Sequence, residues 1–211
     1  MNAAIFDFDG TLVDSEKIWE KFESDFFRRF FPEFKNADRD EKFVGASTEI
    51  AFEILVSKFG ERISKTEFLR EFEKFGSDEI YPKVKIFPGA REFLQKIIAA
   101  KIPFAIASNA HRNWILQVLR RENLEQFFAG IFSCEDVENT KPAPDLFLRA
   151  AEFLQISPEN CVAFEDSKTG VAAARAAKMR VGAFAPRGEN FSKVDFTFEN
   201  WAELKVSDYF F

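Results

Sequence analysis

The chain has 211 residues, of which 46% are apolar and 30% are charged, a composition typical of folded globular proteins that excludes an intrinsically disordered one. Its net charge of −6 predicts no binding to nucleic acid and no attraction to an anionic membrane. No apolar stretch approaches the roughly 20 residues of a membrane span, and no signal peptide precedes the first predicted strand, so we expect a cytoplasmic protein.

The two ends of the sequence show the alternation of an α/β fold. Short apolar runs typical of buried strands occur at 3–6, 104–107, 130–132, 161–164, 180–184 and 195–198. Stretches with helical spacing of apolar residues lie between them, at 91–100, 114–119, 145–154 and 170–179. Continuous apolar strands separated by helices predict a parallel sheet covered on both faces.

A different pattern fills residues 15–82. Apolar residues recur there at helical spacing, charged residues fill the gaps, and no strand pattern occurs. We therefore predict one α/β domain, made of residues 1–14 and 83–211, with a second, α-helical domain of residues 15–82 inserted after the first strand.

Four polar groups follow the predicted strands, at the edge where open α/β sheets bind ligands. They are Asp7-Phe8-Asp9-Gly10-Thr11, Ser108-Asn109, Lys141-Pro142 and Glu165-Asp166-Ser167. Each has a structural alternative: a turn that caps a helix, an N-cap, a solvated loop lysine, and acids favoured by a helix dipole.

Phosphoryl transfer with a bound Mg²⁺ explains the four groups together. One aspartate attacks phosphorus and forms an aspartyl-phosphate. Because a carboxylate and a phosphate repel each other, a metal ion and a lysine must offset the charge. A second aspartate protonates the leaving oxygen and later deprotonates the attacking water.

These residues carry a family resemblance. The stretch 7–15, Asp-Phe-Asp-Gly-Thr-Leu-Val-Asp-Ser, looks like the first motif of the haloacid dehalogenase (HAD) superfamily, and the other three groups resemble its second, third and fourth motifs in order. The stretch 141–145 and the helix that begins at Gly170 are similar to the β-phosphoglucomutase-like and phosphatase-like subfamily. The resemblance implies a Rossmann-like parallel sheet core with an inserted α-helical cap domain.

The resemblance implies roles for the first three motifs. Asp7 is expected to be the nucleophile and a Mg²⁺ ligand. Asp9 is expected to be the general acid and base, with its backbone carbonyl on the metal. Ser108 and Lys141 are expected to hold the transferred phosphoryl group, with Asn109 beside them.

The remaining roles concern the metal and the loops. Asp166 is expected to bind Mg²⁺, and Glu165 to act as a direct ligand or from the next shell. Thr11 is expected to steady the loop of Asp9. The inserted helices are expected to close on the substrate and exclude water.

The inserted segment departs from the β-phosphoglucomutases. Trp19 stands where those mutases have a histidine, and residues 43–48 lack their lysine and arginine. The turn Gly45-Ala46-Ser47 is expected to face the substrate, its alternative being a simple connection between helices. A mutase must grip a second phosphate, so the loss of these cations favours hydrolysis.

We therefore predict a monomeric, Mg²⁺-dependent phosphatase of a small phosphomonoester, such as a sugar phosphate. The alternatives are a β-phosphoglucomutase-like phosphomutase, a phosphate-sensing module without turnover and a dehalogenase. Cys134 and Cys161 lack the spacing of a zinc or redox site and are expected to be small buried hydrophobes. The only histidine, His111, is expected to lie at the surface or to cap a helix.

Overall fold

The computed structural model describes residues 2–35, 38 and 48–210, and a parallel sheet forms its centre. The sheet has the strand order β3-β2-β1-β4-β5-β6, with every neighbouring pair parallel. The strands are β1 (Ala3–Phe6), β2 (Phe104–Ala107), β3 (Gly130–Phe132), β4 (Cys161–Glu165), β5 (Arg180–Phe184) and β6 (Phe196–Phe198). This arrangement confirms the predicted Rossmann-like core.

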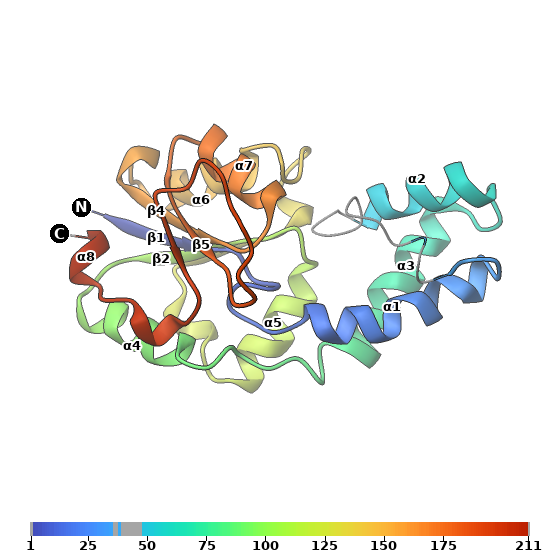
Figure 1. Cartoon of the computed structure of the whole chain (residues 1–211), viewed down its shortest axis with the longest axis horizontal. Helices are drawn as coiled ribbons and strands as arrows, with labels where there is room; N and C mark the ends of the chain where they lie inside the picture. Colours follow the sequence, from blue (N-terminus) through green and yellow to red (C-terminus); the bar gives the residue numbers. More distant parts are fainter. Residues whose placement is uncertain (1, 36–37, 39–47, 211) are drawn as a thin grey trace.

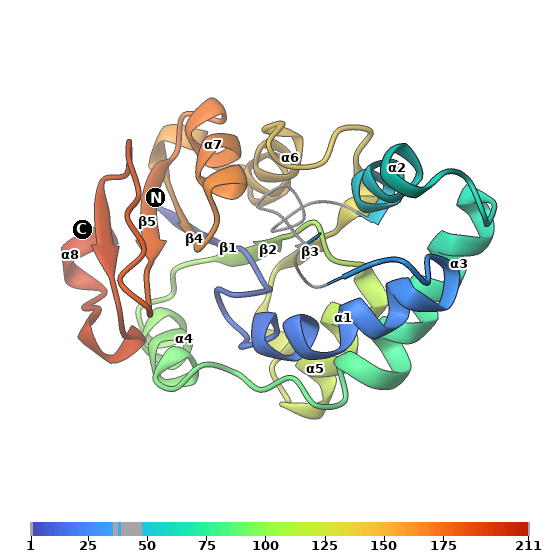
Figure 2. The ribbon, with the colours of Figure 1, turned by 45° about the vertical axis from the view of Figure 1, so that its right-hand side comes forward.

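Helices cover both faces of the sheet (Figures 1 and 2). Ile5 of β1 is buried with Phe147 on one face, and the next residue, Phe6, is buried with Phe93 on the other. Successive strand residues point to opposite faces, which is why a strand covered on both sides is apolar throughout. The helices around the sheet are α4 (Ala90–Ala99), α5 (Arg112–Arg121), α6 (Asp145–Leu154) and α7 (Lys168–Ala176).

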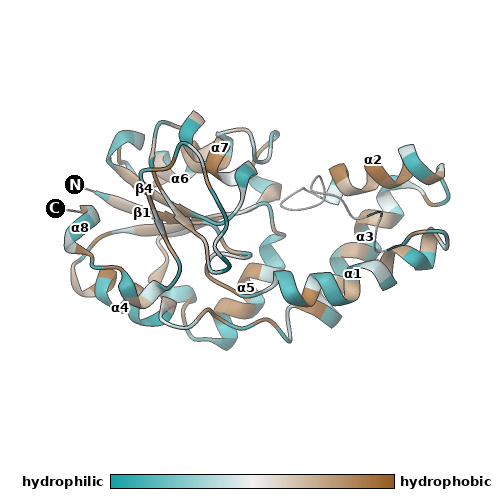
Figure 3. Cartoon of the chain, viewed as in Figure 1, coloured by the Kyte–Doolittle hydropathy of each residue, from teal (hydrophilic) through white to brown (hydrophobic). Residues whose placement is uncertain are grey.

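The first part of the segment between β1 and β2 forms three helices that Figure 1 shows together at one end of the molecule. Its helices are α1 (Glu16–Phe30), α2 (Thr48–Phe59) and α3 (Lys65–Phe75), and a single π-helical turn (Gly76–Ile80) follows α3. Figure 3 shows hydrophilic and hydrophobic residues alternating along α1. The apolar side is rich in phenylalanine: the ring of Phe26 lies 5.6 Å from that of Phe68 and 5.2 Å from that of Phe72. Each such buried ring contributes roughly 1.5–3 kcal/mol.

An aromatic cluster joins the inserted helices to the sheet domain. Tyr81 stacks on Trp114 of α5 with ring centroids 4.9 Å apart, and Trp19 of α1 lies 5.6 Å from Trp114. The indole N–H of Trp114 donates to the backbone carbonyl of Glu73, at 3.0 Å. Trp19 therefore packs as one of the aromatic side chains of this cluster.

The predicted elements occur with shifted ends. The strand predicted at 161–164 extends to Glu165, and the helix predicted at 114–119 spans Arg112–Arg121. The sequence pattern does not predict the π-helical turn or the short C-terminal helix α8 (Ser207–Phe210). None of the described helices combines the length and the apolar character needed to cross a membrane.

Candidate active site

The loop after β1 places two aspartates at the carboxyl end of the central strand. The backbone N–H of Asp7 donates to the carbonyl of Phe164, so Asp7 still lies in the register of β4. The chain then turns at Gly10, whose φ is +78°. A Cβ on Gly10 would lie 2.0 Å from Oδ2 of Asp166, so only glycine allows the loop to approach the acids that follow β4.

Lys141 reaches into the same edge of the sheet. Its ammonium lies 2.5 Å from Oδ1 of Asp7 and 2.5 Å from Oε1 of Glu165, and its side chain is 4% exposed. Burial alone would lower the pKa of Lys141, but the charges of the two acids outweigh it and raise that pKa. The lysine is therefore a cation held between two buried carboxylates.

Asn109 fixes the backbone of Lys141 on both sides. Its side-chain oxygen accepts from the Lys141 N–H at 3.0 Å, and its side-chain nitrogen donates to the Lys141 carbonyl at 3.3 Å. Asn109 comes from the loop after β2, so it ties two strand-end loops together. Beside it, the buried Ser108 accepts a hydrogen bond from the N–H of Ala110, at 3.2 Å.

Asp7, Glu165 and Asp166 form an acidic cluster, which is the feature that suits a metal ion. Each offers a carboxylate oxygen, and these oxygens lie within 4.8 Å of one another. Burial, followed by the charge of Asp7, raises the pKa of Asp166 well above its usual range, and burial also raises the pKa of Glu165. A hard divalent cation takes oxygen ligands and would offset this repulsion, so the donor set fits Mg²⁺.

Two neighbours support the acidic cluster. The hydroxyl of Thr11 donates to Oδ1 of Asp166 at 2.7 Å, while the indole of Trp201 donates to the Thr11 carbonyl at 3.1 Å. A Cβ on Gly170 would lie 1.9 Å from Oε1 of Glu165, so α7 approaches the carboxylate closely. In this structure the fully buried Thr11 contacts an acid of the cluster.

Asp9 points to a different partner. Its Oδ2 accepts from the hydroxyl of Tyr81 at 2.7 Å, and its buried Oδ1 has no hydrogen-bond partner among the described residues. Burial raises the pKa of Asp9 to about 6, although the hydroxyls of Ser15 and Tyr81 partly offset the rise. The Asp9 carboxylate therefore lies outside the acidic cluster, and its contact with Tyr81 is not predicted by the sequence pattern.

The predicted substrate turn, Gly45-Ala46-Ser47, lies outside the described residues.

A cavity of about 630 Å³ borders the acidic cluster through Gly10 and Asp166. Its rim includes Lys17 of α1, Lys168 of α7 and Arg187 after β5. Its size is that of a small-molecule site, and it lies between the sheet edge and α1.

Comparison with known proteins gives a consistent family. Residues 4–184 match the family described as haloacid dehalogenase-like hydrolase. The phosphorylated carbohydrates phosphatase of Thermotoga maritima is 32% identical over 84% of this chain and 82% of its own length. The (DL)-glycerol-3-phosphatase 2 of Arabidopsis thaliana is 32% identical over 84% of this chain and 76% of its own length.

Solved structures share the fold over nearly the whole chain. CbbY from Rhodobacter sphaeroides, in complex with phosphate, has a TM-score of 0.82 at 22% identity and covers 99% of both chains. The β-phosphoglucomutase of Clostridium difficile has a TM-score of 0.81 at 21% identity, covering 99% of this chain and 95% of its own. At these identities the likeness concerns the fold.

Proposed function

The chain belongs to the haloacid dehalogenase-like hydrolase family, and we propose that it is a Mg²⁺-dependent phosphatase of a small phosphomonoester, such as a sugar phosphate, acting through an aspartyl-phosphate intermediate. The observation that carries this proposal is the acidic cluster of Asp7, Glu165 and Asp166 with Lys141 between two of its members. Relatives named as phosphatases of carbohydrates and of glycerol phosphate support the substrate class.

Asp7 is the proposed nucleophile. One of its carboxylate oxygens forms a bond to phosphorus while the bond from phosphorus to the leaving oxygen breaks. Lys141, 2.5 Å from Oδ1 of Asp7, lowers the repulsion between the carboxylate and the phosphate, and the hydroxyl of Ser108 is the proposed contact to a phosphoryl oxygen. Asn109 keeps Lys141 in place through its backbone.

Asp9 is the proposed general acid and base. In its protonated form it gives a proton to the leaving oxygen, and it then takes a proton from the water that hydrolyses the aspartyl-phosphate. The products are an alcohol and inorganic phosphate, with Asp7 restored as a carboxylate. Tyr81 is the hydrogen-bond partner of Asp9 in this structure, so the acid must exchange that contact for the substrate.

Asp7, Asp166 and the backbone carbonyl of Asp9 are the proposed Mg²⁺ ligands, with Glu165 direct or one shell further out. The ion would supply charge stabilisation to the phosphoryl oxygens. Residues 15–82 are the proposed cap domain, which excludes water from the site. We predict a monomer in the cytoplasm, which sedimentation and cell fractionation can test.

A screen for phosphate release tests this proposal. Purified protein is incubated with sugar phosphates, glycerol phosphate and nucleoside monophosphates, with Mg²⁺ and with EDTA, and Asp7→Asn is the control. We expect release from at least one substrate that needs both Mg²⁺ and Asp7. Release that persists in Asp7→Asn, or none from any compound, would contradict the proposal.

The same assay separates a phosphomutase from a hydrolase. A mutase converts one sugar phosphate to its isomer without net release of phosphate, and it needs a bisphosphate to start. The packing of Trp19 against Phe72, with stacked rings 5.0 Å apart, leaves no phosphate-binding base at that position. This contact favours the hydrolase.

A further inference from the structure

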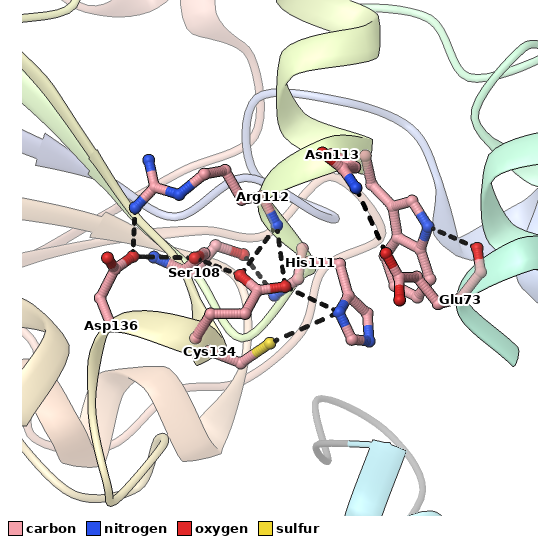
Figure 4. Close-up of polar contacts among 11 residues, drawn as sticks. Glu73, Ser108, His111, Arg112, Asn113, Cys134 and Asp136 are labelled. Atoms are coloured by element: carbon pink, nitrogen blue, oxygen red, sulfur yellow. Dashed lines mark hydrogen bonds and ion pairs between the residues drawn. The ribbon is translucent and has the colours of Figure 1, made fainter. Parts of the chain in front are cut away.

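A second group of metal-ligating side chains lies outside the acidic cluster. His111 precedes α5, and Cys134 and Glu135 begin the turn of 3-10 helix that follows β3. The three side chains offer a nitrogen, a sulfur and an oxygen, all within 4.8 Å of one another. Figure 4 shows the sulfur of Cys134 directed at the ring of His111.

The distances suit tetrahedral coordination. Nδ1 of His111 lies 3.9 Å from Sγ of Cys134 and 2.8 Å from Oε1 of Glu135. Ligand atoms bound to one ion at about 2.0–2.3 Å lie roughly 3.3–3.7 Å apart, between these two values. The Glu135 side chain is 46% exposed, so it can adjust and leaves a path for an ion to enter.

Neighbouring groups hold the carboxylate in place. Oε2 of Glu135 accepts hydrogen bonds from the hydroxyl of Ser133 and from the N–H of Arg112, the latter at 3.1 Å. Such supporting contacts around a ligand orient it and raise metal affinity.

The histidine ring is also held, but not by hydrogen bonds alone. It packs edge-on against Trp114 with ring centroids 4.5 Å apart. Nε2 is buried and has no hydrogen-bond partner among the described residues. The packing on Trp114 therefore fixes the ring with its other nitrogen, Nδ1, directed at Cys134 and Glu135.

We propose that His111, Cys134 and Glu135 bind a divalent transition-metal ion of the Zn²⁺ or Co²⁺ type, with water as the fourth ligand. Thiolate and imidazole ligands favour such ions over Mg²⁺. Cys134 releases its thiol proton to solvent when the sulfur–metal bond forms, and its thiolate together with the Glu135 carboxylate balances the two charges of the ion. The neutral His111 ring binds through Nδ1 and keeps its proton on Nε2.

The ion would have a structural effect near Ser108, in the loop after β2. The N–H of Ala110 donates to the hydroxyl of Ser108, and the N–H of Cys134 donates to the Ala110 carbonyl at 3.4 Å. An ion at His111 and Cys134 would clamp the loop after β2 to the loop after β3. Binding of this ion does not depend on the proposed hydrolase activity.

Co²⁺ absorption tests the site directly. Reduced protein in EDTA is exchanged into excess Mg²⁺ and titrated with Co²⁺, while the near-ultraviolet band of a thiolate bound to Co²⁺ is recorded. The acidic cluster contains no sulfur and cannot give this band. We expect saturation at one ion per chain, loss of the band in Cys134→Ala, and an unchanged band in the matched control Cys161→Ala, whose thiol is fully buried elsewhere.

Two further variants keep the test decisive if Cys134→Ala folds poorly. We expect His111→Ala and Glu135→Gln each to weaken Co²⁺ binding at least tenfold, while their melting temperatures in EDTA stay close to that of the wild type. Absence of the band in the wild type, its persistence in Cys134→Ala, or full affinity in both other variants would overturn the proposal. Saturation at half an ion per chain would also overturn it, because two chains would then share the ion.

Discussion

Lys141→Met removes the cation that lies between two buried carboxylates. Both ion pairs are 2.5 Å long, and the side chains of Asp7 and Glu165 are 11% and 0% exposed. Breaking a buried pair by removing one partner costs about 3–5 kcal/mol, because a buried charge is left without compensation. For a domain of this size that loss lowers the melting temperature by roughly 6–20 °C.

Lys65→Met is the matched control. Lys65 also pairs with a glutamate, Glu53, at 3.0 Å, but the two side chains are 45% and 66% exposed. Exposed pairs contribute about 0.2–1 kcal/mol, so the control should melt within a few degrees of the wild type.

Melting curves in EDTA and in Mg²⁺ separate the two effects. We expect Mg²⁺ to stabilise Lys141→Met more than the wild type, because a cation at the acidic cluster replaces part of the missing charge. Equal losses in the two lysine variants, or an equal response to Mg²⁺ in Lys141→Met and the wild type, would refute the charge-balance reasoning.

Single substitutions and chemical treatments test the other contacts. Asp9→Asn should lower kcat by roughly 10²–10⁴-fold, and a small change would assign the acid to another group. Gly170→Ala places a Cβ 1.9 Å from Glu165 and should lower the urea-measured stability by about 1–3 kcal/mol; an unchanged midpoint would contradict the close packing. EDTA should abolish phosphate release and Mg²⁺ should restore it, whereas activity in EDTA would exclude the metal. Burial raises the pKa of Cys161 to about 12, so its thiol stays protonated at pH 8 and should resist iodoacetamide until the protein is unfolded, as mass spectrometry can show.

The acidic cluster could be predicted from sequence because it follows from topology. Asp7 and Glu165 each end a buried apolar run, and parallel strands bring such ends to one edge of a sheet. The same rule predicts the sheet and the helices around it. It needs no knowledge of side-chain orientation, which is why it holds for this chain.

Contacts between distant segments could not be predicted in this way. Tyr81 lies 72 positions from Asp9, and their hydrogen bond depends on how the inserted helices rest on α5. Asn109 was expected beside the phosphate, and its contacts with the Lys141 backbone depend on the path of a loop. The contact between His111 and Cys134 likewise depends on two turns. Turns have no periodic sequence pattern, so this contact could not be predicted from the sequence.

The aromatic cluster between the inserted helices and the sheet domain makes the intrinsic fluorescence of the protein sensitive to how these two parts are arranged. Two of the three tryptophans, Trp19 and Trp114, lie on opposite sides of the contact between α1 and α5, with ring centroids 5.6 Å apart. The third, Trp201, is buried and packs against Phe93 of α4. Tryptophan emission from a Trp201→Phe variant therefore comes from the aromatic cluster alone. A motion of α1 relative to α5 would change this emission and could be followed in solution without an attached dye.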